Sequence, residues 1–277
     1  MAFRGQMARR QPDRFWPRSA RGARQALRTW LFGGAMVLGG PVSAQMGETD
    51  IGHWSPSSAD TILSAEFTGP TARYAHAVLG DGLEWGGLTL TFAGHNGTAM
   101  SLEIQLPQDH VFEDLQPRLV DLTLDGRANA VMVVETDMAR GAALALYGVG
   151  GKIAETPHIG QRNRWLAPIG AADLDGDGKV ELAYIDRPHL AKTLRIWRFE
   201  GDELAEIASL PGLTNHRIGE DFITSGMRDC GEGPEIITVD ATWSRVVASR
   251  LAQTAVEARD IGPFSGPEAV AKALNCS

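Results

Sequence analysis

The sequence has few cysteines, no phosphate-binding loop and no Gly-x-Ser-x-Gly motif. The last two absences exclude P-loop nucleotide-binding proteins and serine hydrolases that carry a nucleophile elbow. His76, His158 and His216 lack the short spacing that is typical of zinc ligands. No apolar run after residue 44 is long enough to cross a membrane, so we expect no integral membrane segment in the rest of the chain.

The first 44 residues are expected to form a secretory signal peptide. A region rich in arginine precedes the apolar stretch 30–38, and residues 42–44 offer the small side chains that a signal peptidase accepts. We therefore expect cleavage after Ala44 and a periplasmic or secreted mature protein. The alternatives are an organelle-targeting peptide and a membrane anchor, but several glycines and Pro41 interrupt the stretch, which is also short for a bilayer.

Removal of this leader makes the protein strongly acidic. Eight of the 26 basic residues and one of the 34 acidic residues precede residue 29, so 18 basic and 33 acidic residues remain, a formal charge near −15. Such a surface repels nucleic acid and favours cations. In an oxidising compartment Cys230 and Cys276 are expected to form one disulfide that ties down the carboxyl terminus, the alternative being two reduced, buried thiols.

A unit of about fifty residues recurs along the chain. Its clearest copy has short apolar segments at 165–172, 181–186, 193–199 and 204–210, with an acidic turn at 173–178, which predicts a four-stranded antiparallel meander. Asp121 heads a similar turn 52 residues earlier, and Asp229 heads another 56 residues later. A weaker first copy contains Asp81.

The repeats predict an all-β fold, a small β-propeller of four to five blades with a short C-terminal helix at 267–274. We expect residues 45–70 to be an N-terminal segment whose strand completes a blade begun by the other end of the chain. The propeller repeats would occupy 71–265 and a helical tail 266–277. A β-sandwich is the main alternative, but it predicts no regular copy of an Asp-rich turn.

The clearest turn is a candidate metal site. Its carboxylates, Asp173, Asp175 and Asp177, alternate with small or apolar residues, and we expect the carbonyl of Lys179 and the carboxylate of Glu181 to join them around Ca²⁺. An EF-hand would need a glutamate at the twelfth position, which is Tyr184. The other alternative is an Asp-Gly turn that only shapes the backbone.

The segment Asp-Leu-Asp-Gly-Asp-Gly-Lys-Val-Glu-Leu-Ala-Tyr resembles the FG-GAP and VCBS repeats found in integrin α-chain propellers. The resemblance extends less strongly over about residues 71–265. It implies a radial propeller with calcium in its blade turns and a role in adhesion, ligand binding or structural support. The turns at Asp121 and Asp229 depart from the family pattern by losing acids or a residue, so we expect one good metal site and at most one weak one.

Polar residues in the loops suggest a ligand pocket, with Arg164, His189, His216 and Asp221 as its candidates. The alternative is that each of them caps a blade or pairs with a neighbour. The sequence therefore predicts an exported calcium-binding propeller, a monomer that acts as a non-catalytic binding or scaffold module of the cell envelope for a protein or glycan. The alternative is a hydrolase or lyase on the same scaffold, acting through Arg164, His216 and Asp221.

Overall fold

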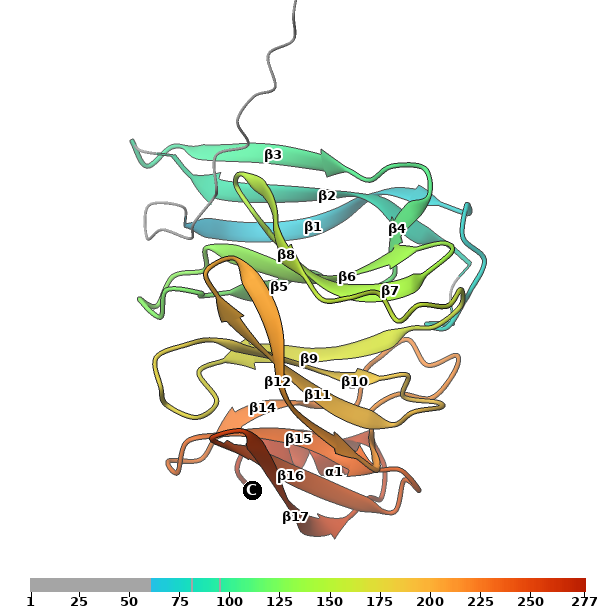
Figure 1. Cartoon of the computed structure of the whole chain (residues 1–277), viewed down its shortest axis with the longest axis vertical. Coiled ribbons are helices and arrows are strands. Elements are labelled where there is room, and N and C mark those ends of the chain that lie inside the picture. Colours follow the sequence, from blue (N-terminus) through green and yellow to red (C-terminus); the bar gives the residue numbers. More distant parts are fainter. Residues whose placement is uncertain (1–60, 81, 95) are drawn as a thin grey trace, which may run out of the picture. The chain divides into compact units, whose positions relative to one another are not determined.

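The computed structural model of the chain describes residues 61–80, 82–94 and 96–277, and there the fold is all-β with one short helix. Its strands pair in antiparallel fashion, and successive groups of strands follow one another in chain order (Figure 1). The expected signal peptide, the cleavage site at Ala44 and the turn at Asp81 lie outside the described residues. No helix in the described part of the chain is long and apolar enough to cross a lipid bilayer.

The first group of strands contains β1 (Ile62–Thr71), β2 (Glu84–Ala93) and β3 (Ala99–Gln105). β1 pairs with β2 along its whole length, so the expectation that it completes a blade from the other end of the chain is corrected. The reason is packing: Phe67 of β1 lies opposite Leu88 of β2, and both side chains belong to the same apolar core. The pairing is therefore local in sequence.

The second group contains β5 (Arg118–Val120), β6 (Ala130–Asp137), β7 (Gly141–Gly148) and β8 (Gly151–Glu155). Every residue of β6 and β7 is buried. Strands that are buried along their whole length are expected where both faces of a sheet are covered. The three-residue strand β4 (His110–Phe112) pairs with both β2 and β6 and joins the first two groups into one hydrogen-bonded sheet.

The third group is the predicted four-stranded meander. It contains β9 (Leu166–Ala172), β10 (Glu181–Asp186), β11 (Thr193–Glu200) and β12 (Glu203–Pro211), in the order β12-β11-β10-β9. The prediction of its four strands is confirmed to within one residue at each end. The acidic turn that begins at Asp173 connects β9 to β10.

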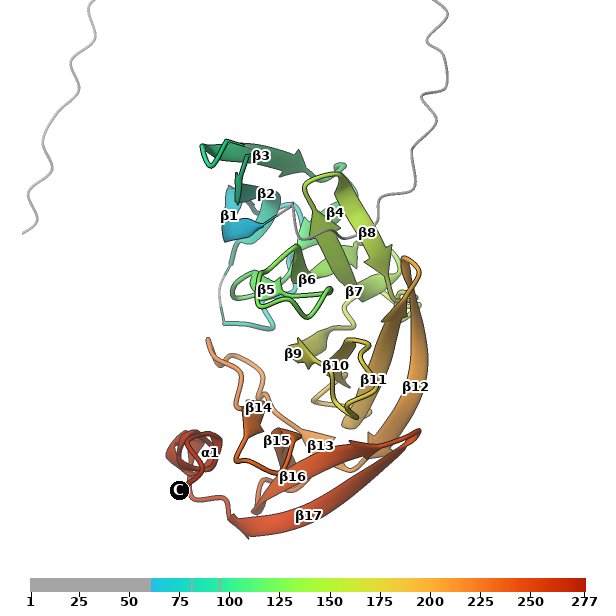
Figure 2. The ribbon, with the colours of Figure 1, turned by 90° about the vertical axis from the view of Figure 1, so that its left-hand side faces the viewer.

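The fourth group contains β13 (Leu213–Thr214), β14 (Gly226–Asp229), β15 (Pro234–Asp240), β16 (Arg245–Ala252) and β17 (Ala255–Pro263). The helix α1 (Pro267–Leu274) follows it and lies beside β14 and β15 (Figure 2). This is the predicted C-terminal helix. Proline at its first position has no amide that would go unbonded, and Glu268 and Lys272 lie at the ends where their charges suit the helix dipole.

Alternation of side chains places an apolar core between each pair of successive groups. Along β6, Val131 and Val133 face the first group, whereas Met132 and Val134 face the third. The strand β10 divides in the same way, since Leu182 belongs to the core shared with the second group and its neighbour Ala183 to the core shared with the fourth. The groups therefore form a continuous stack.

The two ends of this stack differ from its middle. On the first group, one face carries cross-strand rows of polar residues such as Glu66, Thr89 and Glu103. On the fourth group, Ile237 and Val239 pack against Val270 of α1. A polar outer face and a covering helix are the features of terminal repeats in an open array. A closed propeller of four to five blades is not confirmed.

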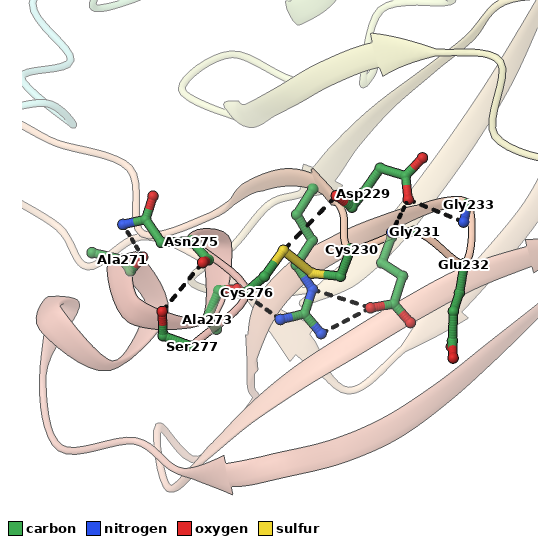
Figure 3. The surroundings of a disulfide bond; sticks show 12 residues. Asp229, Cys230, Gly231, Glu232, Gly233, Ala271, Ala273, Asn275, Cys276 and Ser277 are labelled. Atoms are coloured by element: carbon green, nitrogen blue, oxygen red, sulfur yellow. Dashed lines mark hydrogen bonds and ion pairs between the residues drawn. A yellow bond between two sulfur atoms is a disulfide. The ribbon is translucent and has the colours of Figure 1, made fainter.

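A disulfide joins Cys230, in the turn between β14 and β15, to Cys276, just after α1 (Figure 3). Beside it, Arg228 donates a hydrogen bond of 2.6 Å to the carbonyl of Ala273 and forms an ion pair of 2.8 Å with Glu235. The bridge closes a loop of 46 residues, which in the chain-entropy picture destabilises the unfolded state by about 4 kcal/mol. The covering helix is therefore covalently tied to the sheet that it covers.

Candidate functional sites

The acidic turn between β9 and β10 is wound around the carboxylate of Asp173. One oxygen of Asp173 accepts a hydrogen bond of 2.8 Å from the amide of Gly176, and the other accepts one of 3.0 Å from the amide of Gly178. Both glycines have positive φ, at 79° and 86°, a conformation that a side chain would strain. The turn therefore depends on its glycines as much as on its acids.

The carboxylates of Asp173, Asp175 and Asp177 converge as the sequence predicts, with one oxygen from each lying within 4.8 Å of the others. Glu181 is also close, but its oxygens have protein partners. One accepts a hydrogen bond of 2.8 Å from the amide of Leu174, and burial is the largest influence on the carboxyl group, raising its pKa. The side chain of Lys179 points to an ion pair of 2.8 Å with Glu200.

The guanidinium of Arg198, on β11, lies against this acidic group. Its nitrogens are 2.7 Å from Asp175, 3.0 Å from Asp177 and 2.6 Å from Glu181. Burial opposes the charge of Arg198, but hydrogen bonds to Glu181 and Asp175 outweigh it and raise the pKa of the guanidinium. The positive charge that three neighbouring carboxylates require is therefore supplied by the chain itself.

The donor set of the turn fits a hard cation in part. Three convergent carboxylates suit Ca²⁺, which binds six to eight oxygens. Two conditions reduce the fit: Glu181 has both oxygens engaged, and Arg198 occupies an oxygen of Asp175 and one of Asp177. A bound cation would therefore use the three aspartates and compete with the guanidinium.

In the related turn at Asp121, neutral side chains stand at two positions where the third repeat has carboxylates. Asn129 occupies the position of Glu181, and its amide oxygen accepts a hydrogen bond of 2.9 Å from the amide of Leu122. Its amide nitrogen donates a hydrogen bond of 2.8 Å to the hydroxyl of Thr123, which stands where the third repeat has Asp175. The loss of acids from this turn is thus matched by neutral hydrogen-bonding partners.

The turn at Asp229 retains the buried glutamate of the pattern, Glu235, and surrounds it with arginines. The carboxylate of Glu235 is 2.8 Å from Arg228, 3.1 Å from Arg250 and 2.7 Å from Arg259. Burial would raise the pKa of Glu235, but the hydrogen bonds from Arg259 and Arg228 outweigh it, and the pKa is lowered. This turn also holds its glutamate with protein cations.

A pocket of about 410 Å³ lies among loops of the second, third and fourth groups and the segment between β1 and β2. It is lined by His76, Val78, Asn163, Arg164, Trp165, Arg187, His189, Leu190 and Ile218. Leu190 and Ile218 are exposed apolar residues. In the part of the chain that the structure describes, Arg164 has no carboxylate partner, whereas Arg187 pairs with Asp186 at 2.8 Å.

Hydrogen bonding and burial favour the neutral forms of His189, which lines the pocket, and of His216, which lies behind it. The Nε2 of His216 is 2.9 Å from the carbonyl of Glu220, which can only accept, so this nitrogen carries the proton. The Nδ1 of His216 then accepts a hydrogen bond of 3.0 Å from the Nε2 of His189. Burial, followed by the nearby His216 and His76, lowers the pKa of His189 to about 4, and burial also lowers the pKa of His216.

The floor of the pocket is tied to a buried glutamate. The carboxylate of Glu113 contacts the Nδ1 of His76 and accepts a hydrogen bond of 2.7 Å from Thr136. Its backbone carbonyl accepts a hydrogen bond of 2.8 Å from the indole of Trp165, on which the ring of His189 stacks. Residues far apart in sequence are thus fixed around one cavity.

The structure brings together three of the four predicted pocket residues. Arg164 and His189 line the cavity, and His216 lies behind His189. Asp221 borders a different cavity, of about 400 Å³, with Phe222 and Ile223. The set Arg164, His216 and Asp221 that the enzyme alternative needs is therefore not assembled in one pocket. The sequence did not predict His76 as a pocket residue. His76 lacks the short spacing to other ligands that would have marked it as a candidate.

A second group of potential metal ligands contains His110, Asp137 and His158, whose ligand atoms lie within 4.8 Å of one another. Their separations of 27 and 21 residues give no local pattern. His110 and Asp137 meet because they are cross-strand partners of β4 and β6. Only the fold brings the three side chains together.

No protein-family model matches this chain, and no curated protein matches it. The resemblance to FG-GAP and VCBS repeats therefore depends on the residues of the acidic turn and on the recurrence of similar turns before β6 and β15.

Proposed function

We propose that the chain is an exported, non-catalytic binding module of the cell envelope, of the FG-GAP/VCBS type, that binds an acidic glycan. The observation that carries this proposal is the pocket that contains Arg164. Its guanidinium has no carboxylate partner among the described residues, and burial lowers the pKa of His189 in the pocket and of the adjacent His216. An arginine without a carboxylate partner favours an anionic ligand in this pocket, and this local attraction acts against the net negative charge of the whole chain.

The shape and polarity of the pocket suit a sugar. The rim residues Leu190 and Ile218 expose apolar surface on which one face of a sugar ring can pack. Asn163 and His76 offer polar groups for hydroxyls at the same cavity. Carboxylate binding by Arg164 would then select uronic acids or other acidic sugars over neutral ones.

The test is titration calorimetry with oligosaccharides of uronic acids, with neutral oligosaccharides of the same length for comparison. We expect the wild type to bind the acidic sugars and Arg164→Gln to bind them at least about tenfold more weakly, since a charge-assisted hydrogen bond is worth about 1.5–3 kcal/mol. Arg245→Gln is the matched control, because it removes the same charge from an exposed pair with Asp260. Equal binding by the wild type and Arg164→Gln would refute the assignment of this pocket as the binding site for acidic sugars.

We also propose Ca²⁺ as the ion of the turn at Asp173, bound by Asp173, Asp175 and Asp177 in competition with Arg198. The convergent oxygens of the three aspartates support this proposal. The four groups of strands are proposed to be blade-like units of an open arc, which agrees with the polar face at one end and the helix at the other. Small-angle scattering of the monomer would distinguish an open arc from a ring.

Export to the periplasm or the medium is proposed from residues 1–44, and the acidic mature chain supports a partner other than nucleic acid. Fractionation of cells and sequencing of the mature amino terminus test the proposal, and we expect the mature protein to begin at Gln45. Recovery of the protein in the cytoplasm with Met1 intact would contradict it.

A further inference from the structure

We propose that His110, Asp137 and His158 bind a zinc-class divalent transition-metal ion, at a site separate from the acidic turn and from the pocket. Imidazole and carboxylate ligands in a two-to-one set are suited to zinc and its neighbours rather than to calcium. The three ligand atoms lie within 4.8 Å of one another. Two of them, the Nε2 of His110 and the Oδ2 of Asp137, are 3.7 Å apart, close to the separation of about 3.3–3.5 Å that tetrahedral coordination with metal–ligand bonds near 2.0–2.1 Å requires.

The backbone holds His158 in the form that a metal ligand needs. Its Nδ1 donates a hydrogen bond of 2.7 Å to the carbonyl of Gly141, so its Nε2 is the unprotonated nitrogen. That Nε2 is buried and has no hydrogen-bond partner among the described residues. A histidine ligand typically has its second nitrogen fixed by a carbonyl or a carboxylate in this way. A buried lone pair without a donor is what a bound cation would satisfy.

Close backbone packing fixes this position. Gly141 has a φ of 81°, and a Cβ atom there would lie 2.4 Å from the carbonyl oxygen of Gln161. Any larger residue would push the segment that carries His158 away from the end of β7. The glycine therefore sets the approach of His158 to the β6–β7 turn, where Asp137 lies.

His110 is oriented by the same kind of contact. Its Nδ1 lies 2.9 Å from the carboxylate of Asp109, which leaves the Nε2 to face Asp137. The carbonyl of Asp109 in turn accepts a hydrogen bond of 2.9 Å from the amide of Met138, just after β6. The Nε2 of His110 is also 3.9 Å from Glu135, a buried carboxylate that could provide a further oxygen. Each ligand is thus set by a neighbour that is not itself a ligand.

Asp137 has one competing partner. Its Oδ1 accepts hydrogen bonds from the amides of Ala139 and Arg140, which fix the carboxylate, and its Oδ2 is 2.6 Å from the guanidinium of Arg140. The side chain of Arg140 is 57% exposed, so it can turn into solvent when a metal ion binds. Because of this competition, removal of Arg140 should strengthen metal binding. A purely structural role of these residues does not predict that effect.

The test uses the purified protein without a histidine tag, freed of metal by a chelator and titrated with Co²⁺ as a visible probe for Zn²⁺. We expect one equivalent to bind, with the visible absorption of a low-symmetry cobalt site, and Zn²⁺ to displace it. His110→Gln and His158→Gln should each weaken binding by more than about tenfold, since even changes to the neighbours of metal ligands cost about 10–100-fold. Arg140→Gln should bind more tightly than the wild type.

Two control variants separate this site from the others. His189→Gln removes a histidine of the pocket, and Asp175→Asn removes a carboxylate of the acidic turn, so both should bind Co²⁺ as the wild type does. Melting curves of the metal-free variants show whether each one is folded before it is titrated. Absence of cobalt binding by the wild type, or equal binding by the wild type and a folded His158→Gln, would overturn the proposal and leave the glycan pocket and the acidic turn unaffected.

Discussion

Arg198 is predicted to act as the built-in cation of the acidic turn, and replacing it should make the fold depend on calcium. The guanidinium contacts Asp175, Asp177 and Glu181 at 2.6–3.0 Å, and its side chain is 16% exposed. In Arg198→Gln these carboxylates lose their counter-charge, and Glu181 is fully buried. Removal of one partner of a buried ion pair costs about 3–5 kcal/mol.

The expected effect is large enough to measure by thermal melting. Because part of the group is open to solvent, we take the lower value, about 3 kcal/mol, which for a domain of this size lowers the Tm by about 6–12 °C. Calcium that binds only the folded protein stabilises it by about 2.7 kcal/mol at a hundred times its Kd. Saturating Ca²⁺ should therefore return most of the lost stability to Arg198→Gln.

The assay compares melting curves in EDTA and in Ca²⁺ for the wild type and Arg198→Gln. In the wild type the ion must displace Arg198, so we expect a smaller shift with calcium than in the variant. Arg245→Gln is the control, because its exposed pair with Asp260 is worth no more than about 1 kcal/mol and lies outside the turn. If Arg198→Gln melts as the wild type does in EDTA, or gains nothing from calcium, the assignment of Arg198 as a stand-in cation is refuted.

Two further predictions concern the end of the stack and the pocket. Replacement of both Cys230 and Cys276 by serine should lower the Tm by about 8–16 °C, from the loss of about 4 kcal/mol of loop-closure stabilisation, and added reductant should have no further effect on that variant. His189 has its pKa lowered from 6.5 to about 4, so the unfolded chain binds its proton first and stability should fall as pH drops from 6.5 to 4. Melting temperatures across that range should decline less in His189→Gln, and an equal decline would contradict the burial of a neutral imidazole.

The positions of the longer strands could be predicted from the sequence because they have a local signal, whereas the short strands β4 and β13 were not predicted. The segments 181–186 and 193–199 are apolar, lie between turn residues, and correspond to β10 and β11. The helix at Pro267–Leu274 was predicted with its observed bounds from one proline and one acid. The predicted partner of β1 was wrong, because nothing in residues 62–71 indicates which strand they will pair with. That choice depends on the apolar face of β2.

The candidate sites could be predicted only where their residues are close in sequence. Asp173, Asp175 and Asp177 are spaced by two and converge within one turn. Arg198 was missed because it lies on β11 and reaches the turn only when β10 and β11 pair, with Glu181 directly opposite it. The sequence around a charged residue on a strand does not indicate which residue of another strand it will pair with.

The three acidic turns differ in the residue that each places at the start of its central strand. At the start of each central strand, or directly before it, the chain has Asn129, Glu181 or Glu235, and in the first two the side chain accepts a hydrogen bond from the amide that follows the leading aspartate. Asn129 donates to Thr123, Glu181 pairs with one arginine, and Glu235 pairs with three. In each of the three turns the chain itself therefore supplies hydrogen-bonding or charged partners for this residue. The turn at Asp121 accordingly keeps the hydrogen bond to its leading segment with an asparagine in place of the glutamate.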